Sequence, residues 1–440
     1  MTSKSDLMTP QDEIDALRDT FLAAQAKQPA SFTATPASPS PVLKAAWDSY
    51  YAAIDELRRA LENTSMFQAP QDRAKAYHQL LEIQAFAYNV IVAPRLESPR
   101  VIRNTNWQTD IYAVGLIAPD IVYGKVLLDS AQTYVLSGHI GDAAMMIIQS
   151  TNELHSLGAD KKAIGRSYLL DDMDVADDGY YEITFGGPEQ PRNWIPLDPA
   201  VSHHSMLIRR IFRDPGHDDQ GDIRIRRVTP VDRRHYDFDE FDEAAMAERL
   251  RRAEAFVRLY VMEFVIGIYD FTMAGTDGQV HAMTLMPGGT LTAGSPLSRY
   301  AIGRFSIRED EAVIIDLETD PDSFYWGFML GDTWSRALSF NTWQTALNSS
   351  QVRADRDGGM RLVISAQDPG IANWLDSTGH EHGSIVFRNY AAKQPTVPTM
   401  RLVKFADLPA LLPHAVPVTQ AERDAALEHR RAGYLRLYGE

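Results

Sequence analysis

The spacing of hydrophobic residues along the chain predicts helices near its start. In 42–62 and 70–93, apolar side chains recur every three or four positions, which is typical of amphipathic helices. Pro94 ends the second of these segments, because proline cannot donate the backbone hydrogen bond that would continue a helix. A shorter helix is predicted over 10–29, and a helix rich in charged residues from 417 onward.

After Pro94 the pattern changes to short runs of β-branched and aromatic residues, separated by Gly, Pro, Asp and Asn. This composition predicts strands joined by turns, and it continues to about residue 230. A long helix is then expected from Asp239, as its N-cap, to about 273. A glycine-rich loop over 287–300 follows it, and the strand pattern returns beyond the loop.

The two strand-rich regions contain the same anchors in the same order. Gly141-Asp142 and Gly331-Asp332 each follow an aromatic strand, and each precedes an Asn-Trp pair, at 193–194 and 373–374. An arginine inside an apolar strand follows each pair, at 209 and 388. We therefore predict a duplicated antiparallel β-sandwich, with helices ahead of the first copy and a long helix inserted between the copies. The repeated Asn-Trp is interpreted mainly as the corner of a repeated fold, because asparagine can bond turn backbone and tryptophan can bury its ring.

The predicted fold class is α+β, and the chain is expected to divide into five segments. These are an N-terminal helical region (1–94), a first β-sandwich unit (95–230), an inserted helix with its glycine-rich loop (231–300), a second β-sandwich unit (301–400) and a C-terminal helical tail (401–440).

Composition narrows the possible functions. The chain of 440 residues has a net charge of −16, which disfavours nucleic acid and anionic membranes as partners. It contains no cysteine, which excludes disulfides, thiolate nucleophiles and iron–sulfur clusters. The most hydrophobic window, 256–273, carries three charged residues and is expected to be a buried helix. No apolar segment opens the chain, so a cytoplasmic protein is expected.

Three short patterns resemble a known family. The run DPG..NWLD..GH..G over 368–383, the run N.NW.TDIY over 104–112 and the late strand ending in Arg388 are similar to the family that carries the domain of unknown function 1214. The N-terminal half resembles the companion domain of unknown function 1254. The resemblance covers most of 95–395 and implies a pair of jelly-roll-like β domains with flanking helices. It implies no particular reaction, but such proteins are associated with bacteria that degrade aromatic or steroidal compounds.

The arginines inside apolar strands are candidates for anion recognition. Arg209, Arg210 and Arg388 interrupt hydrophobic runs, where a buried guanidinium needs an acceptor of opposite charge. That acceptor is either a structural carboxylate or the carboxylate of a substrate. The structural candidates are Asp142, Asp332 and Asp376.

The stretch NTNWQTDIY gathers polar and aromatic residues at the entrance to the first β unit. Asn104, Asn106, Trp107, Asp110 and Tyr112 fall within nine residues. Such density suits a site in which a few polar groups orient an apolar ligand. An Asx-turn with a buried polar network explains it equally well.

The motif GHEHG contains two histidines that are candidate metal ligands. His380 and His382 would point to one face of a strand, but no third ligand follows them, so solvated or hydrogen-bonded histidines are the preferred interpretation and no metal is assigned. There is no dinucleotide, phosphate-loop, zinc-protease or serine-hydrolase motif, and no cofactor is expected.

These observations favour a cofactor-independent enzyme of lyase type, acting on a C–C or C–O bond of a hydrophobic, aromatic small molecule by decarboxylation or elimination. General acid–base groups would move protons while arginine stabilises negative charge. Catalysis is assigned to Tyr112, His380, Asp110 and Arg388, and substrate binding to Asn104, Asn106, Trp107, Arg209, Trp374 and Tyr325.

Two alternatives stay open: a non-catalytic β-sandwich binding or assembly protein, and a glycan or ester hydrolase that uses a carboxylate pair. A homo-oligomer is compatible with any of these functions, although no residue pattern demonstrates one.

Overall fold

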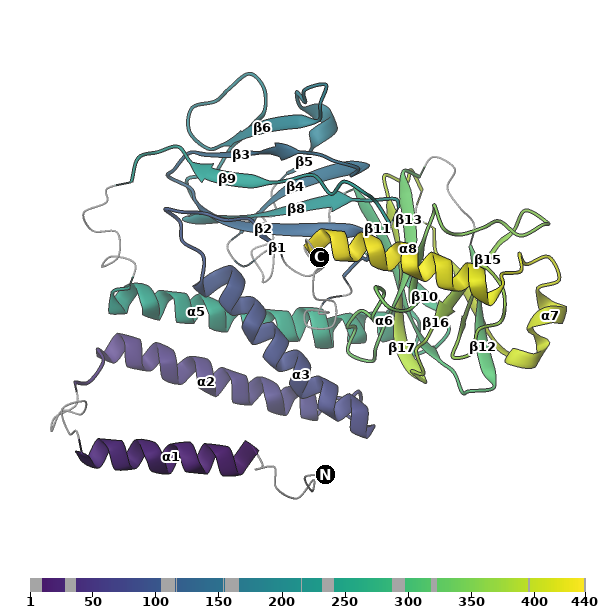
Figure 1. Cartoon of the computed structure of the whole chain (residues 1–440), viewed down its shortest axis with the longest axis horizontal. Coiled ribbons are helices and arrows are strands. Elements are labelled where there is room, and N and C mark those ends of the chain that lie inside the picture. Colours follow the sequence, from purple (N-terminus) through teal and green to yellow (C-terminus); the bar gives the residue numbers. More distant parts are fainter. Residues whose placement is uncertain are drawn as a thin grey trace, which may run out of the picture.

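The computed structural model describes residues 10–27, 37–103, 115, 117–152, 154, 166–214, 216–231, 241–286, 297–317, 323–394 and 396–438. The N-terminal helices and the inserted helix lie at one side of the molecule, and the two β-sandwiches with the C-terminal helices form the rest (Figure 1). The helices are α1 (Pro10–Lys27), α2 (Pro41–Glu62), α3 (Pro70–Ala87), α5 (Glu243–Leu259), α6 (Gly267–Gly275), α7 (Leu408–Leu411) and α8 (Gln420–Tyr438). Among the described residues, no helix is both long and apolar enough to cross a membrane.

The first sandwich is built from strands β1 to β9. They are β1 (Ile102–Arg103), β2 (Ile121–Asp129), β3 (Tyr134–His139), β4 (Met145–Asn152), β5 (Ser167–Leu169), β6 (Tyr180–Phe185), β7 (Trp194–Ile195), β8 (His203–Ile211) and β9 (Arg224–Arg227). One sheet has the order β1-β2-β8-β4-β5 and the other the order β7-β6-β3-β9.

The second sandwich repeats this arrangement strand for strand. Its strands are β10 (Met283–Met286), β11 (Ser298–Ser306), β12 (Glu311–Leu317), β13 (Tyr325–Gly331), β14 (Ala346–Asn348), β15 (Met360–Ser365), β16 (Trp374–Asp376), β17 (His382–Tyr390) and β18 (Thr399–Lys404). The sheet orders are β10-β11-β17-β13-β14 and β16-β15-β12-β18, so each strand of the first unit has a counterpart nine strands later. The α+β class and the duplication are confirmed.

The second sandwich begins earlier in the chain than expected. By sequence, β10 and only the start of β11 (298–300) fall within the predicted inserted helix and glycine-rich loop, yet both strands belong to the five-stranded sheet. Of that loop, residues 287–296 lie outside the described part, and β11 starts at Ser298. The pattern failed here because glycine and serine around the strand start resemble a turn, whereas pairing with β17 decides the conformation.

The inserted helix runs without a break from Glu243 to Gly275, through a π-helical segment at Tyr260–Ile266 between α5 and α6. Asp242 caps it, accepting a hydrogen bond from the Ala245 amide at 2.7 Å. The predicted cap, Asp239, lies outside the described residues. The buried face of this helix packs with α2 and α3 in one apolar cluster. A second π-helical segment, Tyr88–Val92, ends α3.

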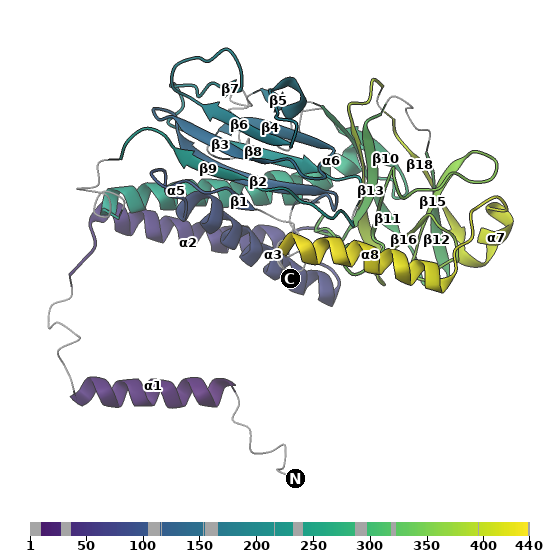
Figure 2. The ribbon, with the colours of Figure 1, turned by 45° about the horizontal axis from the view of Figure 1, so that its top comes forward.

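The two sandwiches meet through their five-stranded sheets, which cross near α6 and α8 (Figures 1 and 2). Because side chains alternate along a strand, each of these sheets has one face toward its own sandwich interior and one toward the other sandwich. In β17, Ile385 and Phe387 belong to the interior cluster, whereas Val386 and Tyr390 belong to the cluster between the sandwiches. We call the space between these two sheets the junction. α1 lies apart from the rest of the chain (Figure 2).

Candidate functional site

A tyrosine and an arginine form the same cross-strand pair in both sandwiches, and both pairs lie on the junction side of their sheets. Tyr123 of β2 is opposite Arg209 of β8, and Tyr300 of β11 is opposite Arg388 of β17. The Arg209 guanidinium carbon lies 6.0 Å from the Tyr123 ring centre, and that of Arg388 lies 5.1 Å from the Tyr300 ring centre. Both arginines are buried, so each sheet brings one guanidinium into the junction.

The rings of these pairs are more accessible than the arginines. Tyr123 and Tyr300 stay partly exposed although Arg209 and Arg388 beside them are buried.

The carboxylates expected to neutralise the arginines are engaged elsewhere. Asp142 accepts the backbone amides of Asp218 and Asp219; Asp332 pairs with Lys75 and Arg336; and Asp376 accepts the amide of Thr378. The predicted structural pairing with these three aspartates is wrong, because each of them is held by groups other than the three arginines.

The two arginines of the double-Arg strand point in opposite directions. Arg209 faces the junction, where its Nη1 donates to Gln149 Oε1 at 2.7 Å. Arg210 faces the opposite side of the sheet and donates to the backbone carbonyl of Gln220. Alternation along β8 thus leaves Arg209 as the anion-binding candidate.

The junction contains two tyrosines whose acidities are shifted in opposite directions. Burial alone would raise the pKa of Tyr300, but the positive charges of Arg388 and Arg209 lower it below the usual value of a tyrosine. Ser298 Oγ also donates a hydrogen bond to Tyr300 Oη, at 2.8 Å. Burial and the neighbouring Tyr300 raise the pKa of Tyr390 instead. Titratable neighbours whose environments separate their pKa values are suited to act as base and acid.

Tyr325, predicted to bind substrate, does lie in the junction. Its hydroxyl donates to Asp120 Oδ2 at 2.5 Å, and its ring centre is 5.9 Å from that of Tyr390. Burial raises the pKa of Asp120 above its usual value, although the bond from Tyr325 opposes that rise. The Tyr325 hydroxyl is thus hydrogen-bonded to a buried carboxyl, and its ring packs in the apolar cluster of the junction.

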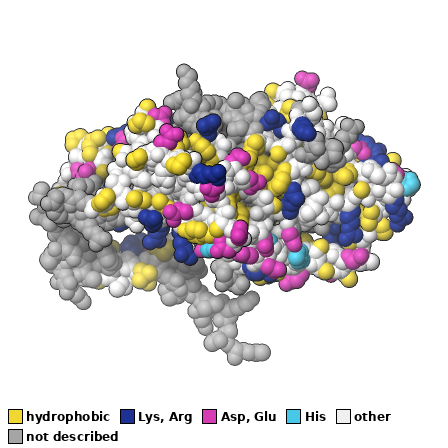
Figure 3. All heavy atoms as spheres, turned by 90° about the horizontal axis from the view of Figure 1, so that it is seen from above, with side chains coloured by type: hydrophobic (Ala, Val, Ile, Leu, Met, Phe, Trp, Pro, Cys, Tyr) yellow, Lys and Arg dark blue, Asp and Glu magenta, His cyan; other side chains and the backbone are white. Residues whose placement is uncertain are grey.

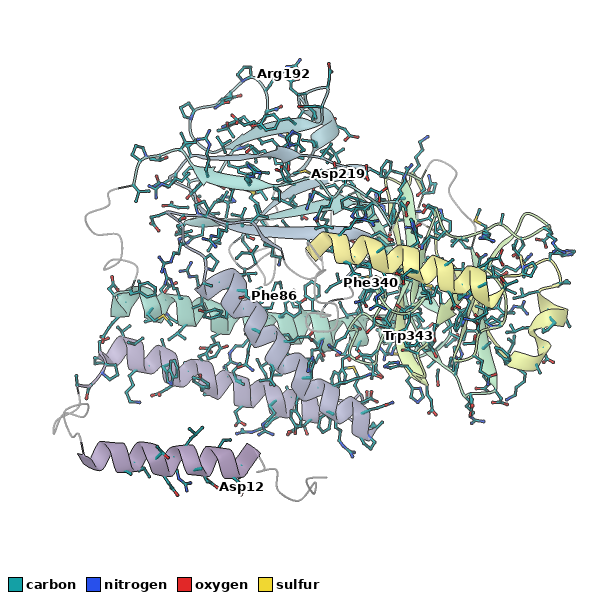
Figure 4. The ribbon with its side chains drawn as sticks, viewed as in Figure 1. Asp12, Phe86, Arg192, Asp219, Phe340 and Trp343 are labelled. Atoms are coloured by element: carbon teal, nitrogen blue, oxygen red, sulfur yellow. The ribbon has the colours of Figure 1, made fainter. Side chains whose placement is uncertain are left out.

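Lys125 is a buried cation that the sequence interpretation missed. It follows Tyr123 by two positions on β2 and is 7 % exposed. Its Nζ lies 4.7 Å from the ring centre of Phe86, a residue of α3 that Figure 4 shows beneath the sheet of β2. Burial, together with the charge of Arg209, lowers the pKa of Lys125 to about 7. The available signal was a single lysine inside the apolar run of residues 121–128.

His380 is not brought together with Arg388. It lies in the turn before β17, whereas Arg388 lies near the end of that strand, roughly 20 Å away at the usual rise per residue. Its Nε2 is 2.5 Å from Lys75 Nζ, and its Nδ1 is 3.0 Å from Thr378 Oγ1. Burial and Lys75 lower its pKa. Within the described ranges, no group of three or more potential ligand side chains could hold a metal ion.

The predicted residues Asn104, Asn106, Trp107, Asp110 and Tyr112 lie outside the described residues. The positions that flank this stretch lie near the junction. Arg103 pairs with Gly124, the residue between Tyr123 and Lys125. Gly115 lies beside Tyr260 and Phe264 of the π-helical segment. The roles assigned to these five residues stay predictions.

The repeated Asn-Trp proves to be a structural corner in both units. The Asn193 side chain accepts the amide of Asp174 and donates to the carbonyls of Asp174 and Glu182; Asn373 makes the same three bonds to Arg353 and Arg361. The two indole N–H groups donate to carbonyls in matching turns, those of Gly186 and Ser365. Trp374, predicted to bind substrate, is buried in this corner instead of facing the junction.

A concavity lies at the far end of the first sandwich, apart from the junction. It has a volume of about 550 Å³ and is lined by residues that include Arg166, Tyr168, Asp172, Arg192 and Trp194. Figure 4 shows Arg192 at the tip of the molecule, well away from the junction. Arg192 forms an ion pair with Asp174 on the exposed surface, where solvent screens the charge of the pair. On the face drawn in Figure 3, acidic and basic side chains lie among hydrophobic ones without forming one continuous patch of either sign.

Comparisons with known proteins agree with this architecture. Residues 307–394, which span β12 to β17, match a family model described as protein of unknown function, DUF1214. No curated protein matches the chain. The similarity of the N-terminal half to the companion domain stays a prediction.

Among solved structures, an uncharacterised protein from Burkholderia cenocepacia aligns with 82 % of this chain and 98 % of its own, at 23 % identity and a TM-score of 0.70. A protein from Vibrio parahaemolyticus aligns with 82 % of this chain and 100 % of its own, at 13 % identity and a TM-score of 0.41. The likeness to the Burkholderia protein shows that the two chains share a fold, and residues 307–394 carry the similarity to the DUF1214 family.

Proposed function

We propose that the protein is an enzyme that binds an aromatic or otherwise apolar carboxylate in the junction and acts on it by acid–base chemistry. The reaction is of lyase type, a decarboxylation or an elimination, and the proposal requires no cofactor. The supporting observation is that Arg209 and Arg388, from equivalent strands of the two sandwiches, are both buried on the junction side of their sheets, each beside a tyrosine of the neighbouring strand.

Arginine suits the carboxylate because its planar guanidinium donates two parallel hydrogen bonds to the two oxygens. The surroundings suit the apolar part of the ligand, since the cluster at the junction is made largely of aliphatic and aromatic side chains such as Phe264, Phe271 and Phe340. A buried charge pair in such a setting gains strength from the low local polarity.

Tyr300 supplies the proton chemistry in this proposal. With its pKa lowered, the Tyr300 phenol is more readily deprotonated. The resulting phenolate accepts a proton from a substrate hydroxyl or carbon. In a decarboxylation the bond between the carboxylate and its neighbouring carbon breaks, carbon dioxide leaves, and the electron pair passes to an unsaturated group of the substrate. A proton from Tyr300 or water then replaces the lost carboxylate.

The hydrolase alternative needs two carboxylates near one bond. Of the described carboxylates, Asp120 lies in the junction and accepts from Tyr325, and Glu82 receives two hydrogen bonds from Arg336, at 2.9 and 3.2 Å. These bonds favour structural roles for both carboxylates.

The test is a thermal-shift comparison of aromatic acids with their uncharged amides, such as benzoate and cinnamate against benzamide and cinnamamide. A ligand at 100 times its dissociation constant stabilises the folded state by about 2.7 kcal/mol. We expect acids to shift the wild type more than amides, and Arg388→Ala to weaken acid binding at least tenfold. Arg192→Ala, which removes the arginine at the tip, should bind like the wild type.

Equal shifts by acids and amides would contradict the carboxylate proposal. A loss of binding in Arg192→Ala with none in Arg388→Ala would move the site to the concavity at the tip. A melting curve without ligand shows whether each variant is folded.

A further inference from the structure

Lys125 lies on β2 between apolar cross-strand neighbours and against an aromatic ring. Its neighbours across the two adjacent strands are Ile102 of β1 and Leu207 of β8, and Phe86 of α3 lies against its amino group. Among the described residues, none forms a hydrogen bond or an ion pair with the Lys125 amino group, and the charge that acts on it, that of Arg209, repels it. A lysine placed in this way is costly for the fold, because burial without a counter-charge disfavours the ammonium form.

The duplication shows that the fold itself does not require a lysine here. Since Tyr123 corresponds to Tyr300, Lys125 corresponds to Ile302 of β11, two positions after the tyrosine in each strand. Ile302 is buried in the apolar cluster of the junction, as expected for a core strand. The first copy thus differs from the second at one position by carrying an amine where a hydrocarbon suffices.

The lysine and the anion-binding groups share one face of the sheet. Lys125 follows Tyr123 by two residues and therefore projects to the same side of β2, and Arg209 lies directly across from Tyr123. A ligand whose carboxylate is held at the arginines would present its neighbouring atoms to the amine.

We infer that Lys125 is a nucleophile that forms an imine with the carbonyl group of the substrate, and that the substrate class is therefore a β-keto acid with an apolar or aromatic substituent. The inference rests on the proposed function for the carboxylate site and adds the chemistry of the second group. A low pKa of about 7 supports it, because about half of the amine is then unprotonated near neutral pH.

The reaction can be written with all atoms accounted for. The neutral amine adds to the ketone carbon, a proton from Tyr300 or water protonates the carbinolamine hydroxyl, and water leaves as the protonated imine forms. The bond to the carboxylate breaks, its electron pair moves to the imine nitrogen, and carbon dioxide and an enamine result. A proton, from Tyr300 or water, adds to carbon, and water then releases the ketone and restores the lysine amine. The net change is a β-keto carboxylate and a proton giving a ketone and carbon dioxide.

The experiment is reductive trapping of the full chain with 4-formylbenzoate and cyanoborohydride at pH 7, followed by peptide mass spectrometry. This probe carries both an aromatic carboxylate and a carbonyl, and reduction fixes the imine as a stable adduct. We expect Lys125 to be modified at least about tenfold faster than any other lysine, because an ordinary lysine is unprotonated to only about one part in a thousand at this pH. Lys125→Met should lose the fast adduct, and Lys404→Met, which removes an exposed lysine on β18, should keep it.

Modification of Lys125 at the rate of exposed lysines, or not at all, would overturn the inference. Retention of the fast adduct in folded Lys125→Met would overturn it equally. The proposed function is tested separately, since benzoate has no carbonyl: Lys125→Met should still be stabilised by benzoate if the arginines hold carboxylates. Failure of benzoate to bind any variant, including the wild type, would instead remove the carboxylate site on which the inference depends.

Discussion

Replacing Lys125 with methionine should make the protein more stable and abolish its reaction. Methionine fills a similar volume, carries no charge and packs well against an aromatic ring such as that of Phe86. The wild type, by contrast, must either deprotonate Lys125 on folding or bury its charge. A residue that lowers stability without a structural need is typical of a functional site.

The magnitude follows from the pKa of the amine. Lysine in an unfolded chain has a pKa of about 10.4, so a folded value of about 7 corresponds to a cost of about 5 kcal/mol when the group is fully protonated in both states. At pH 7 the cost is about 4 kcal/mol, and at pH 9 it is about 2 kcal/mol. Between these pH values the unfolded chain binds more protons than the folded one, so the stability of the wild type rises with pH. Besides burial, the charge of Arg209 contributes to the lowered pKa of Lys125.

The assay is hydrogen–deuterium exchange of the β2 peptide over a denaturant series at pH 7 and pH 9, which yields the free energy of opening for that strand. We expect Lys125→Met to exceed the wild type at pH 7, and the difference to shrink by about 2 kcal/mol at pH 9. Lys404→Met is the control: Lys404 is exposed and pairs with Asp310 and Glu311, so its effect should not change between these pH values. If the difference between Lys125→Met and the wild type is the same at both pH values, Lys125 is not a neutralised buried amine.

Three further changes test other parts of the structure. Tyr300→Phe should lower turnover of the accepted acid by about 10²–10⁴-fold, because the phenol that carries the proton is lost; turnover equal to that of the wild type would exclude Tyr300 as the acid–base group. Tyr325→Phe leaves the buried carboxyl of Asp120 without its donor and should cost about 1–3 kcal/mol in denaturation experiments, whereas no loss would mean that Asp120 is protonated and satisfied without it. Asn373→Ala removes three hydrogen bonds from a buried corner and should cost about 1–3 kcal/mol, more than Asn193→Ala at the more exposed equivalent corner; the reverse order would contradict the burial argument.

The local elements of this protein could be predicted from its sequence with few errors. The helices α2 and α3 and the long inserted helix follow from apolar spacing, since a helix must bury one face and that face has a period of 3.6 residues, whereas α8 was expected from its charged composition. The duplication was predicted from the repeated Asn-Trp together with the Gly-Asp pairs and the strand arginines in the same order. Each Asn-Trp corner uses side-chain bonds to backbone only a short distance along the chain. β10 and the start of β11 were missed because their neighbours, not their own residues, hold them in a sheet.

The candidate site depends on which surfaces meet, and this the sequence could not decide. A period of two residues shows that Arg388 shares a face with Val386 and Tyr390, but it does not show whether that face lies against solvent, helices or another sheet. His380 and Arg388 are eight positions apart in the sequence, yet an extended strand separates them, whereas Arg209 and Arg388 come close only because the two sandwiches pack through equivalent sheets.

The sequence by itself therefore determined the repeated unit and the presence of arginines within its apolar strands. The tertiary structure decided that both arginines act on one tyrosine, and that a single lysine stands where the other copy has isoleucine. The physical reason is that strand geometry is encoded locally, whereas burial and electrostatic shifts are set by groups that only the folded chain brings within reach of one another.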